Sequence, residues 1–184
     1  MIAADRPLRP AAFLDRDGVI NVDTGYPHRV DELVFTPTAI AGVRRLNRAG
    51  FLVIVVTNQS GVARGMFELA DVERFHEEVQ RRLAAHEAHI DAFYIAPWHP
   101  DGSVERYAVD HPDRKPGPGM LLRAFTEWPV DAAASFLIGD KPSDLQAAHR
   151  AGIKGILVPT DSCDLDRVVA DLIGEVAPNA QRTG

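Results

Sequence analysis

Residues Ala11–Asn21 read AAFLDRDGVIN, and the organisation of the whole chain follows from this stretch. The apolar run Ala11–Leu14 predicts a buried strand that ends at a polar residue, Asp15. Asp15 and Asp17 are two carboxylates at i and i+2 across the strand end, where one can act as nucleophile or metal ligand while the other moves protons. Gly18 allows the backbone to turn sharply after them. Paired aspartates are common in surface turns, but the apolar run that precedes them makes this motif specific.

Strand-like and helix-like segments alternate along the rest of the chain. Thr36 and Pro37 predict the start of a helix, with a capping hydroxyl followed by proline in the first turn, and Gly50 predicts its end. Strands are also predicted over residues 51–56, 92–95, 135–138 and 156–158, helices over 71–88, 119–127, 142–152 and 165–173, and a loose tail over 177–184. We expect one α/β domain over residues 1–184, with its core at about 11–175 and helices on both faces of a Rossmann-like parallel sheet.

Polar side chains follow three of these strands: Asp15, then Thr57 with Asn58, then Asp140. Ligands of parallel sheets bind beyond the carboxyl ends of the strands, so these residues are expected to converge on one crevice. In residues 55–61, VVTNQSG, the threonine hydroxyl and the backbone N–H groups of a glycine-containing turn can hold phosphoryl oxygens. Taken alone, Thr57 or Ser60 is better explained as a helix N-cap. Beside the first motif, the anion-binding interpretation is favoured.

Two further motifs supply cations and carboxylates. Lys115 can neutralise charge on a nucleophile and Arg114 offers a planar fork suited to phosphate, although an isolated Arg-Lys pair is usually solvated surface. Within residues 138–144, IGDKPSD, Asp140 is a natural metal carboxylate and Lys141 lies close to it. Two roles stay open for Asp144, which could bind metal through water or favour the helix N-terminus electrostatically.

Composition restricts the classes of partner. The chain has 184 residues and a formal net charge of −6, which argues against a nucleic-acid partner. No apolar run has the roughly 20 residues of a membrane-spanning helix, so no membrane partner is expected. Met1–Pro10 does not resemble a secretory signal, and the single Cys163 fits a reducing compartment, so we expect a cytoplasmic protein. No exposed apolar stripe suggests a dimer, and a monomer is expected.

In this order and spacing, the motifs resemble those of the haloacid dehalogenase-like phosphatases. The similarity is greater to one branch, the D-glycero-D-manno-heptose 1,7-bisphosphate phosphatases and the related histidinol-phosphate phosphatases. It runs over about residues 11–160, and the stretches that carry it are residues 15–26, 57–65 (TNQSGVARG), 99–105 (HPDGSVE) and 114–120 (RKPGPGM). Only about twenty residues separate the first strand from the next helix, too few for the cap domain of many relatives. The resemblance therefore implies a capless phosphatase.

The resemblance also implies roles for the matching residues. Asp15 would be the nucleophile, and Asp17 would protonate the leaving sugar oxygen and then act as base on water. The cofactor Mg²⁺ would bind Asp15, Asp140 and the backbone carbonyl of Asp17. Thr57 and Lys115 would assist at the transferring phosphoryl group. The remaining substrate contacts would come from Asp23, Thr24, Gly25, Tyr26, Asn58, Gln59, Ser60, Arg64, Arg114 and Lys141.

One departure from the branch concerns a structural zinc, which its members commonly bind in the long loop through a Cys-x-His pair and a Cys-x-Cys pair. Those positions here are Ala96, Trp98, His111 and Asp113. Even with His99 as a substitute ligand, three mixed ligands without a thiolate would bind zinc loosely, so no structural zinc is expected. Packing of Trp98 and the loop prolines is expected to order the loop instead.

Within the branch, the favoured substrate is a phosphorylated sugar, heptose 1,7-bisphosphate, from which the 7-phosphate would be removed. This reaction would serve the synthesis of nucleotide-activated heptose for surface polysaccharide. Histidinol phosphate is the alternative, and the choice between the α and β anomers stays open. Other reactive residues are given structural interpretations: His76, His86 and His89 are expected at the surface, and Cys163 is expected to have no part in the chemistry.

Overall fold

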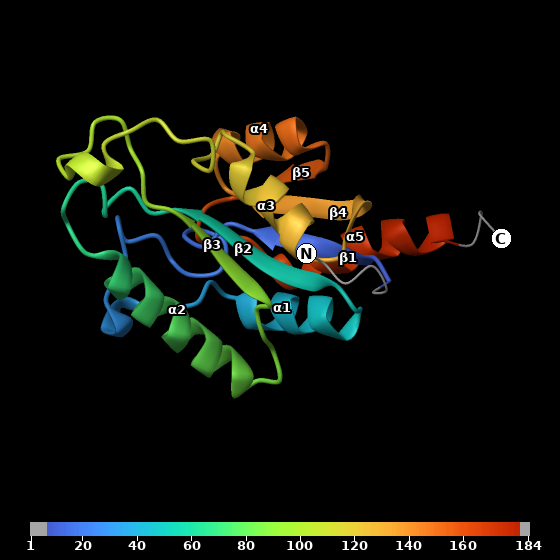
Figure 1. The fold of residues 1–184 in the computed structure, drawn as a ribbon. Helices are drawn as coiled ribbons and strands as arrows, with labels where there is room; N and C mark the ends of the chain where they lie inside the picture. The colour runs from blue at the N-terminus through green and yellow to red at the C-terminus, as the bar shows by residue number, and fades with distance from the viewer. Residues whose placement is uncertain (1–6, 181–184) are drawn as a thin grey trace.

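The computed structural model describes residues 7–180 and has a five-stranded, fully parallel sheet at its centre (Figure 1). The strand order is β3-β2-β1-β4-β5. The central strand β1 is buried on both faces, because Leu14 packs into one hydrophobic cluster and Phe13 into the other. The strands are β1 (Arg9–Leu14), β2 (Leu52–Asn58), β3 (Ala92–Ala96), β4 (Val130–Gly139) and β5 (Lys154–Leu157).

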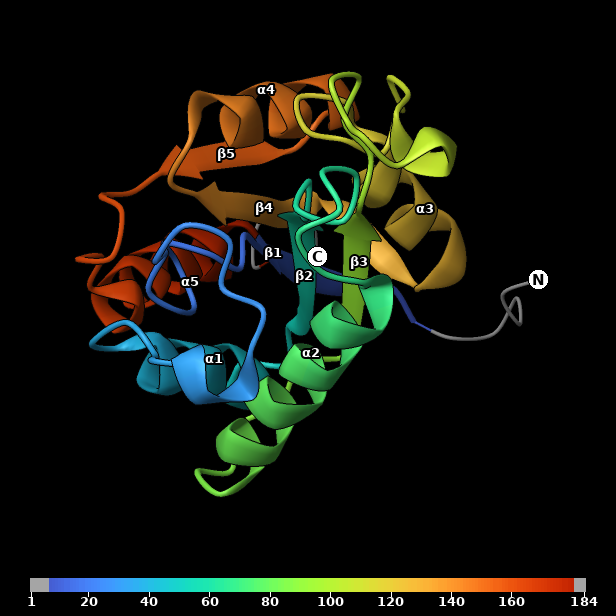
Figure 2. The same ribbon diagram turned by 90° about the vertical axis from the view of Figure 1, so that its left-hand side faces the viewer.

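Helices cover both faces of this sheet and make a three-layered molecule (Figure 2). The first cluster joins the sheet to α1, α2 and α5, and the second joins it to α3 and α4. The predicted α/β fold is confirmed. The helices are α1 (Ala39–Arg48), α2 (Leu69–Ala84), α3 (Gly119–Glu127), α4 (Pro142–Ala151) and α5 (Leu165–Ala180), with short 3₁₀ helices η1 (Val30–Glu32) and η2 (Glu105–Tyr107).

The first helix begins later than predicted. Thr36 is not its cap, because the Thr36 hydroxyl is buried and donates a hydrogen bond to the carbonyl oxygen of Val19 at 2.6 Å. Thr38 occupies the N-cap position instead, and the helix starts at the next residue. The predicted end is correct: Gly50 has a φ of +81°, a backbone conformation that glycine adopts without steric cost.

Three other expectations are wrong. Helix α2 ends at Ala84 and not near residue 88, because the chain turns through Glu87, whose φ is +56°. His76 is buried on the inner side of α2, whereas His86 and His89 are exposed as expected. Helix α5 runs to Ala180 and therefore ends later than the predicted end at residue 173. Residues 181–184 of the predicted tail lie outside the described residues.

The segment between β1 and α1 is a loop that contains η1 and has no separate cap domain. It leaves the carboxyl end of the sheet covered only by loops. Among residues 7–180, no helix combines the length and the apolar character needed to cross a bilayer.

Candidate active site

The carboxyl ends of the neighbouring strands β2, β1 and β4 bring the motifs together at one edge of the sheet. Asp15 directly follows β1, and its backbone N–H donates to the carbonyl oxygen of Ile138 in β4 at 2.9 Å. Thr57 and Asn58 end β2, and Asp140 directly follows β4. The parallel topology therefore places these residues around one site.

Lys115 lies between two buried carboxylates. Its ammonium nitrogen is 2.9 Å from Asp15 Oδ1 and 2.6 Å from Asp144 Oδ1, and it donates to the carbonyl oxygen of Val56 at 2.8 Å. Burial alone would lower the pKa of Lys115, but Asp15 and Asp144 raise it above its usual value. Burial raises the pKa of Asp15 to about 7, although Lys115 acts in the opposite direction. A second cation near Asp15 would therefore favour its ionised, nucleophilic form.

The residues at this edge fit a divalent cation. Carboxylate oxygens of Asp15, Asp140 and Asp144 lie within 4.8 Å of one another. Asp140 Oδ2 accepts a hydrogen bond from the Thr160 hydroxyl at 2.8 Å, whereas Asp140 Oδ1 is buried and has no hydrogen-bond partner within residues 7–180. A buried carboxylate oxygen without a partner is costly, and oxygen ligands of this kind are what Mg²⁺ prefers. Asp15 and Asp140 can thus hold Mg²⁺.

The contacts of two nearby residues, Asp144 and Gly18, explain why these residue types stand at their positions. Asp144 accepts a hydrogen bond at Oδ2 from the backbone N–H of Lys141 at 3.0 Å, which caps α4, while Oδ1 contacts Lys115. Of its two open roles, these contacts favour the one at the helix N-terminus. Gly18 has a φ of +83°, and a Cβ atom there would lie 2.5 Å from Asp140 Oδ2. Only glycine fits at this position.

Asp17 receives hydrogen bonds from four N–H groups. Arg16 donates from Nε to Oδ1 at 2.9 Å and from Nη2 to Oδ2 at 3.0 Å. Asn21 donates to Oδ1 and Gln59 donates to Oδ2, each at 2.9 Å. The sequence motif does not reveal Arg16 as a partner of Asp17, because adjacent side chains of a strand point to opposite faces. The sharp turn after β1 is what brings the two together.

The residues that end β2 make hydrogen bonds within the protein. Asn58 donates from Nδ2 to the carbonyl oxygen of Lys115 at 2.9 Å and accepts at Oδ1 from its backbone N–H at 3.0 Å. The Thr57 hydroxyl is buried and accepts a hydrogen bond from Gln59 at 2.8 Å. Asn58 therefore fixes the backbone that presents Lys115, a role that the sequence alone did not indicate.

A cleft of about 520 Å³ opens above these residues. Thr24 and Arg64 do not line the cleft. Arg64 Nη2 lies 3.2 Å from His99 Nε2. The pKa of Arg114 is lowered mainly by burial and, to a smaller extent, by the positive charge of Arg64. At one side, Lys141 Nζ lies 3.3 Å from Asp23 Oδ2. The predicted residues that line the cleft are Asp17, Asp23, Gly25, Tyr26, Asn58, Gln59, Ser60, Arg114, Lys115 and Lys141, and Pro116 and Ser143 line it as well.

The long loop between β3 and α3 presents Arg114 and Lys115 to the cleft. Trp98 and His111 stack with their ring centroids 3.5 Å apart and their planes 10° from parallel. Asp113 is buried and accepts a hydrogen bond from Arg123 of α3 at 2.8 Å. The residues at three of the four positions discussed for zinc thus form a ring stack and an ion pair.

Comparison with known proteins places this site in a family. The HAD-hydrolase-like family model matches residues 113–180. The D-glycero-β-D-manno-heptose-1,7-bisphosphate 7-phosphatase of Rhodopseudomonas palustris is 45% identical over 164 residues, 89% of this chain and 91% of the relative. The enzyme of the same name from Escherichia coli strain K12 is 47% identical over 144 residues, 78% of this chain and 75% of the relative.

Solved structures agree with these relatives. A structure described as a HAD-like phosphatase from Mesorhizobium loti has a TM-score of 0.84 at 37% identity, over 94% of this chain and 88% of that one. The D,D-heptose 1,7-bisphosphate phosphatase of B. bronchiseptica, complexed with magnesium and phosphate, has a TM-score of 0.78 at 32% identity, over 90% of this chain and 99% of that one. By its motifs, its fold and its relatives, this chain belongs to the D-glycero-β-D-manno-heptose-1,7-bisphosphate 7-phosphatase family of the HAD-like phosphatases.

Proposed function

We propose that this chain is a magnesium-dependent phosphatase that removes the 7-phosphate of D-glycero-β-D-manno-heptose 1,7-bisphosphate through an aspartyl-phosphate on Asp15. The observation that carries the proposal is the placement of Lys115. Its ammonium group contacts Asp15, beneath a cleft whose wall includes Asp17. A nucleophile, a charge-neutralising cation and a proton-transfer group therefore lie at one site. The names of the relatives supply the sugar and the anomer.

Two steps account for the reaction. First, a carboxylate oxygen of Asp15 forms a bond to phosphorus while the bond from phosphorus to the sugar oxygen breaks, and Asp17 gives its proton to that oxygen. Second, Asp17 takes a proton from water, the water oxygen attacks phosphorus, and the bond to Asp15 breaks to release inorganic phosphate. Bound to Asp15, Asp140 and the backbone carbonyl of Asp17, Mg²⁺ would supply charge neutralisation at the phosphoryl oxygens.

Other residues bind and orient the substrate in this proposal. Thr57 and Asn58 contact the transferring phosphoryl group. Cationic side chains at the cleft contact the rest of the anionic sugar, and the flap at residues 23–26 closes over it. The cationic contacts come from Arg114 and Lys141 in the cleft wall and from Arg64 at its margin. Gln59 and Ser60 lie behind the phosphate. In this proposal the enzyme acts in the cytoplasm, as a monomer, on this small molecule. Its molar mass from light scattering tests whether it is a monomer.

The substrate is tested by phosphate release in the presence and absence of Mg²⁺. Both anomers of heptose 1,7-bisphosphate are compared with histidinol phosphate and fructose 1,6-bisphosphate, and ³¹P NMR identifies which phosphate is lost. We expect the β anomer to lose its 7-phosphate fastest, and only with Mg²⁺. Faster phosphate release from histidinol phosphate would show that histidinol phosphate, and not the sugar, is the substrate. Phosphate release without Mg²⁺ would exclude the proposed cofactor.

The covalent step has its own test. Asp15→Asn should lower kcat by roughly 10⁴-fold or more, because no other group can form the bond to phosphorus. Intact-protein mass spectrometry after rapid quenching should show phosphorylation of the wild type and none of the variant. Asp101→Asn is the control, since Asp101 is exposed and does not line the cleft. Substantial activity in Asp15→Asn with a normal unfolding temperature would contradict the covalent mechanism.

A further inference from the structure

A fully buried guanidinium lies behind Asp17. Arg16 has no exposed surface, and besides its two bonds to Asp17 it donates from Nη2 to the carbonyl oxygen of Pro27 at 2.7 Å. Its third nitrogen, Nη1, lies 3.3 Å from His76 Nε2, and the guanidinium carbon is 4.5 Å from the centroid of the Phe75 ring. Each of its nitrogen atoms therefore has a partner, and helix α2 supplies both the partner of Nη1, His76, and the ring of Phe75 against the guanidinium carbon.

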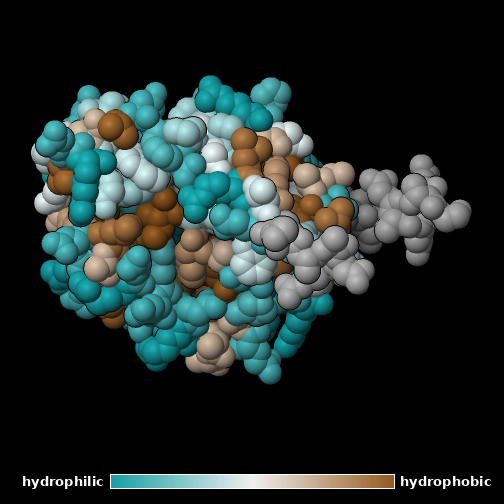
Figure 3. Space-filling view, viewed as in Figure 1, coloured by the Kyte–Doolittle hydropathy of each residue, from teal (hydrophilic) through white to brown (hydrophobic). Residues whose placement is uncertain are grey.

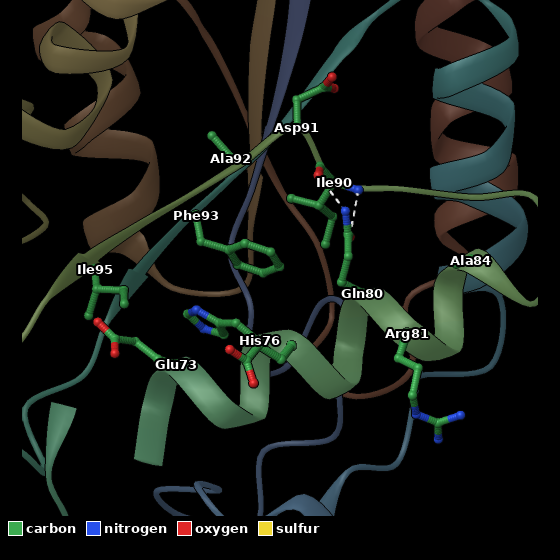
Figure 4. A pocket seen from close by; sticks show the side chains of 11 residues that line it. Glu73, His76, Gln80, Arg81, Ala84, Ile90, Asp91, Ala92, Phe93 and Ile95 are labelled. Carbon is green, nitrogen blue, oxygen red and sulfur yellow. Dashed lines mark hydrogen bonds between the residues drawn. The ribbon is translucent and has the colours of Figure 1, made fainter. Parts of the chain in front are cut away.

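His76 is held in the position that this contact needs. A guanidinium has no acceptor, so His76 Nε2 must accept the hydrogen bond from Arg16. Burial, with Arg16 nearby, lowers the pKa of His76 well below its usual value, so the ring is neutral and can accept. On its other side the ring stacks on Phe93 of β3, with centroids 4.2 Å apart and planes 16° from parallel. Figure 4 shows the two rings face to face.

The histidine reaches the surface through a groove between α2 and the edge strand β3. The groove measures about 820 Å³, and His76, Phe93 and Ile95 contribute to its wall (Figure 4). Figure 3 shows hydrophobic residues along the furrow above α2, with hydrophilic residues on both sides. No contact of the described residues indicates what would cover this groove. It is the histidine's inward contact with Arg16 that has a chemical consequence.

We propose that Arg16, anchored by His76, is a positioning residue that fixes the carboxylate of Asp17 for proton transfer. The proposal rests on the function proposed above, in which Asp17 moves protons in both steps. Both oxygens of Asp17 contact the fork of Arg16, so the carboxylate cannot rotate without breaking two charge-assisted hydrogen bonds. Through Pro27, the same guanidinium also fixes the base of the loop that carries the flap.

A purely stabilising role explains these contacts less well. Removing a guanidinium from water is costly, and buried ion pairs often give no net stability over apolar residues. The side chains of adjacent residues also do not normally meet, so the turn after β1 brings the pair together against the default geometry. Proton-transfer groups, in contrast, lose much of their effect when they are misplaced by about an ångström.

The two reaction steps allow a test. The first step with 4-nitrophenyl phosphate needs no proton from Asp17, because nitrophenolate is a stable leaving group, whereas hydrolysis of the aspartyl-phosphate still needs Asp17 as base. Arg16→Lys keeps the charge but loses the fork. We expect its single-turnover release of nitrophenolate to stay within about twofold of the wild type. Steady-state turnover should fall about 10- to 100-fold, with accumulation of phosphorylated enzyme.

Two variants of the histidine provide a matched pair. His76→Phe keeps a ring against Phe93 but removes the acceptor, whereas His76→Gln offers an amide oxygen in its place. His76→Phe should show the same pattern as Arg16→Lys at a smaller size, roughly 3- to 10-fold, and His76→Gln should restore turnover to within about threefold. Arg81→Lys, an exposed change on the same helix, should leave both rates unchanged.

The outcomes separate the proposals. Equal losses in single-turnover and steady-state rates would show a merely structural role and overturn the inference, as would unchanged rates in Arg16→Lys. If Arg16→Lys does not fold, His76→Phe and His76→Gln provide the test instead. Equal losses in the single-turnover and steady-state rates of His76→Phe, or no recovery in His76→Gln, would then overturn the inference. A wild type that hydrolyses neither this ester nor the heptose bisphosphate would instead refute the proposed function.

Discussion

Asp140 shows how a single atom points to a ligand. Its Oδ1 is buried and finds no hydrogen-bond partner in the described part of the chain, while Thr160 contacts Oδ2. Mg²⁺ should therefore stabilise the folded protein by about 2.7 kcal/mol at 100 times its Kd, which raises Tm by roughly 5 to 10 °C. Asp140→Asn should abolish most of this increase, measured by calorimetry with and without Mg²⁺. Asp101→Asn should retain it, and a full increase in Asp140→Asn would place the ion elsewhere.

The buried side chain of His76 makes the stability of the folded protein depend on pH. Its pKa is well below the unfolded value of about 6.5, so the folded state binds a proton less readily than the unfolded state. The resulting stability is fully present above pH 6.5 and is lost as the pH falls from there towards the folded-state pKa. Denaturant unfolding at pH 7.5 and 5.5 should show a larger loss for the wild type than for His76→Phe. An equal loss would contradict the buried, neutral ring.

At the scale of elements, the loop between β3 and α3 depends on its own packing. The stack of Trp98 on His111 joins the two limbs of the loop, and Arg114 Nη1 donates to the carbonyl oxygen of Trp98 at 3.3 Å. Trp98→Ala should displace Arg114 and raise KM for the heptose bisphosphate roughly 3- to 10-fold, from the loss of about 0.5–1.5 kcal/mol of stacking. Turnover of 4-nitrophenyl phosphate should change little.

Two measurements check this account of the loop. Trp98→Phe should keep most of the affinity, because an aromatic ring remains to stack on His111. Metal analysis of the purified protein should find no stoichiometric zinc, and activity should return fully when Mg²⁺ is added after chelation. One tightly bound zinc per chain would show that a metal, and not the stack, orders the loop.

Whole-molecule topology explains which parts of the site were predictable. Because ligands of a parallel sheet bind beyond its carboxyl strand ends, the meeting of Asp15, Thr57 and Asp140 could be anticipated from the strand pattern alone. Arg16 and His76 are 60 residues apart, and no local periodicity records their contact. Local signals also misplaced the start of α1, since the Thr36 hydroxyl takes a tertiary partner that only the folded chain supplies.

The charge of the whole molecule leads to a last prediction. A net charge of −6 repels an anionic substrate, so attraction must come from cations at the cleft, such as Lys141. Lys141→Gln and Arg48→Gln each remove one positive charge, but Arg48 is exposed and pairs with Glu87 outside the cleft lining. At low ionic strength, Lys141→Gln should raise KM for the bisphosphate roughly 3- to 10-fold, and Arg48→Gln should not. The difference should shrink in about 0.5 M salt, which screens charges over a few ångströms. Equal effects of the two substitutions would show that the overall field, and not the local cation, attracts the substrate.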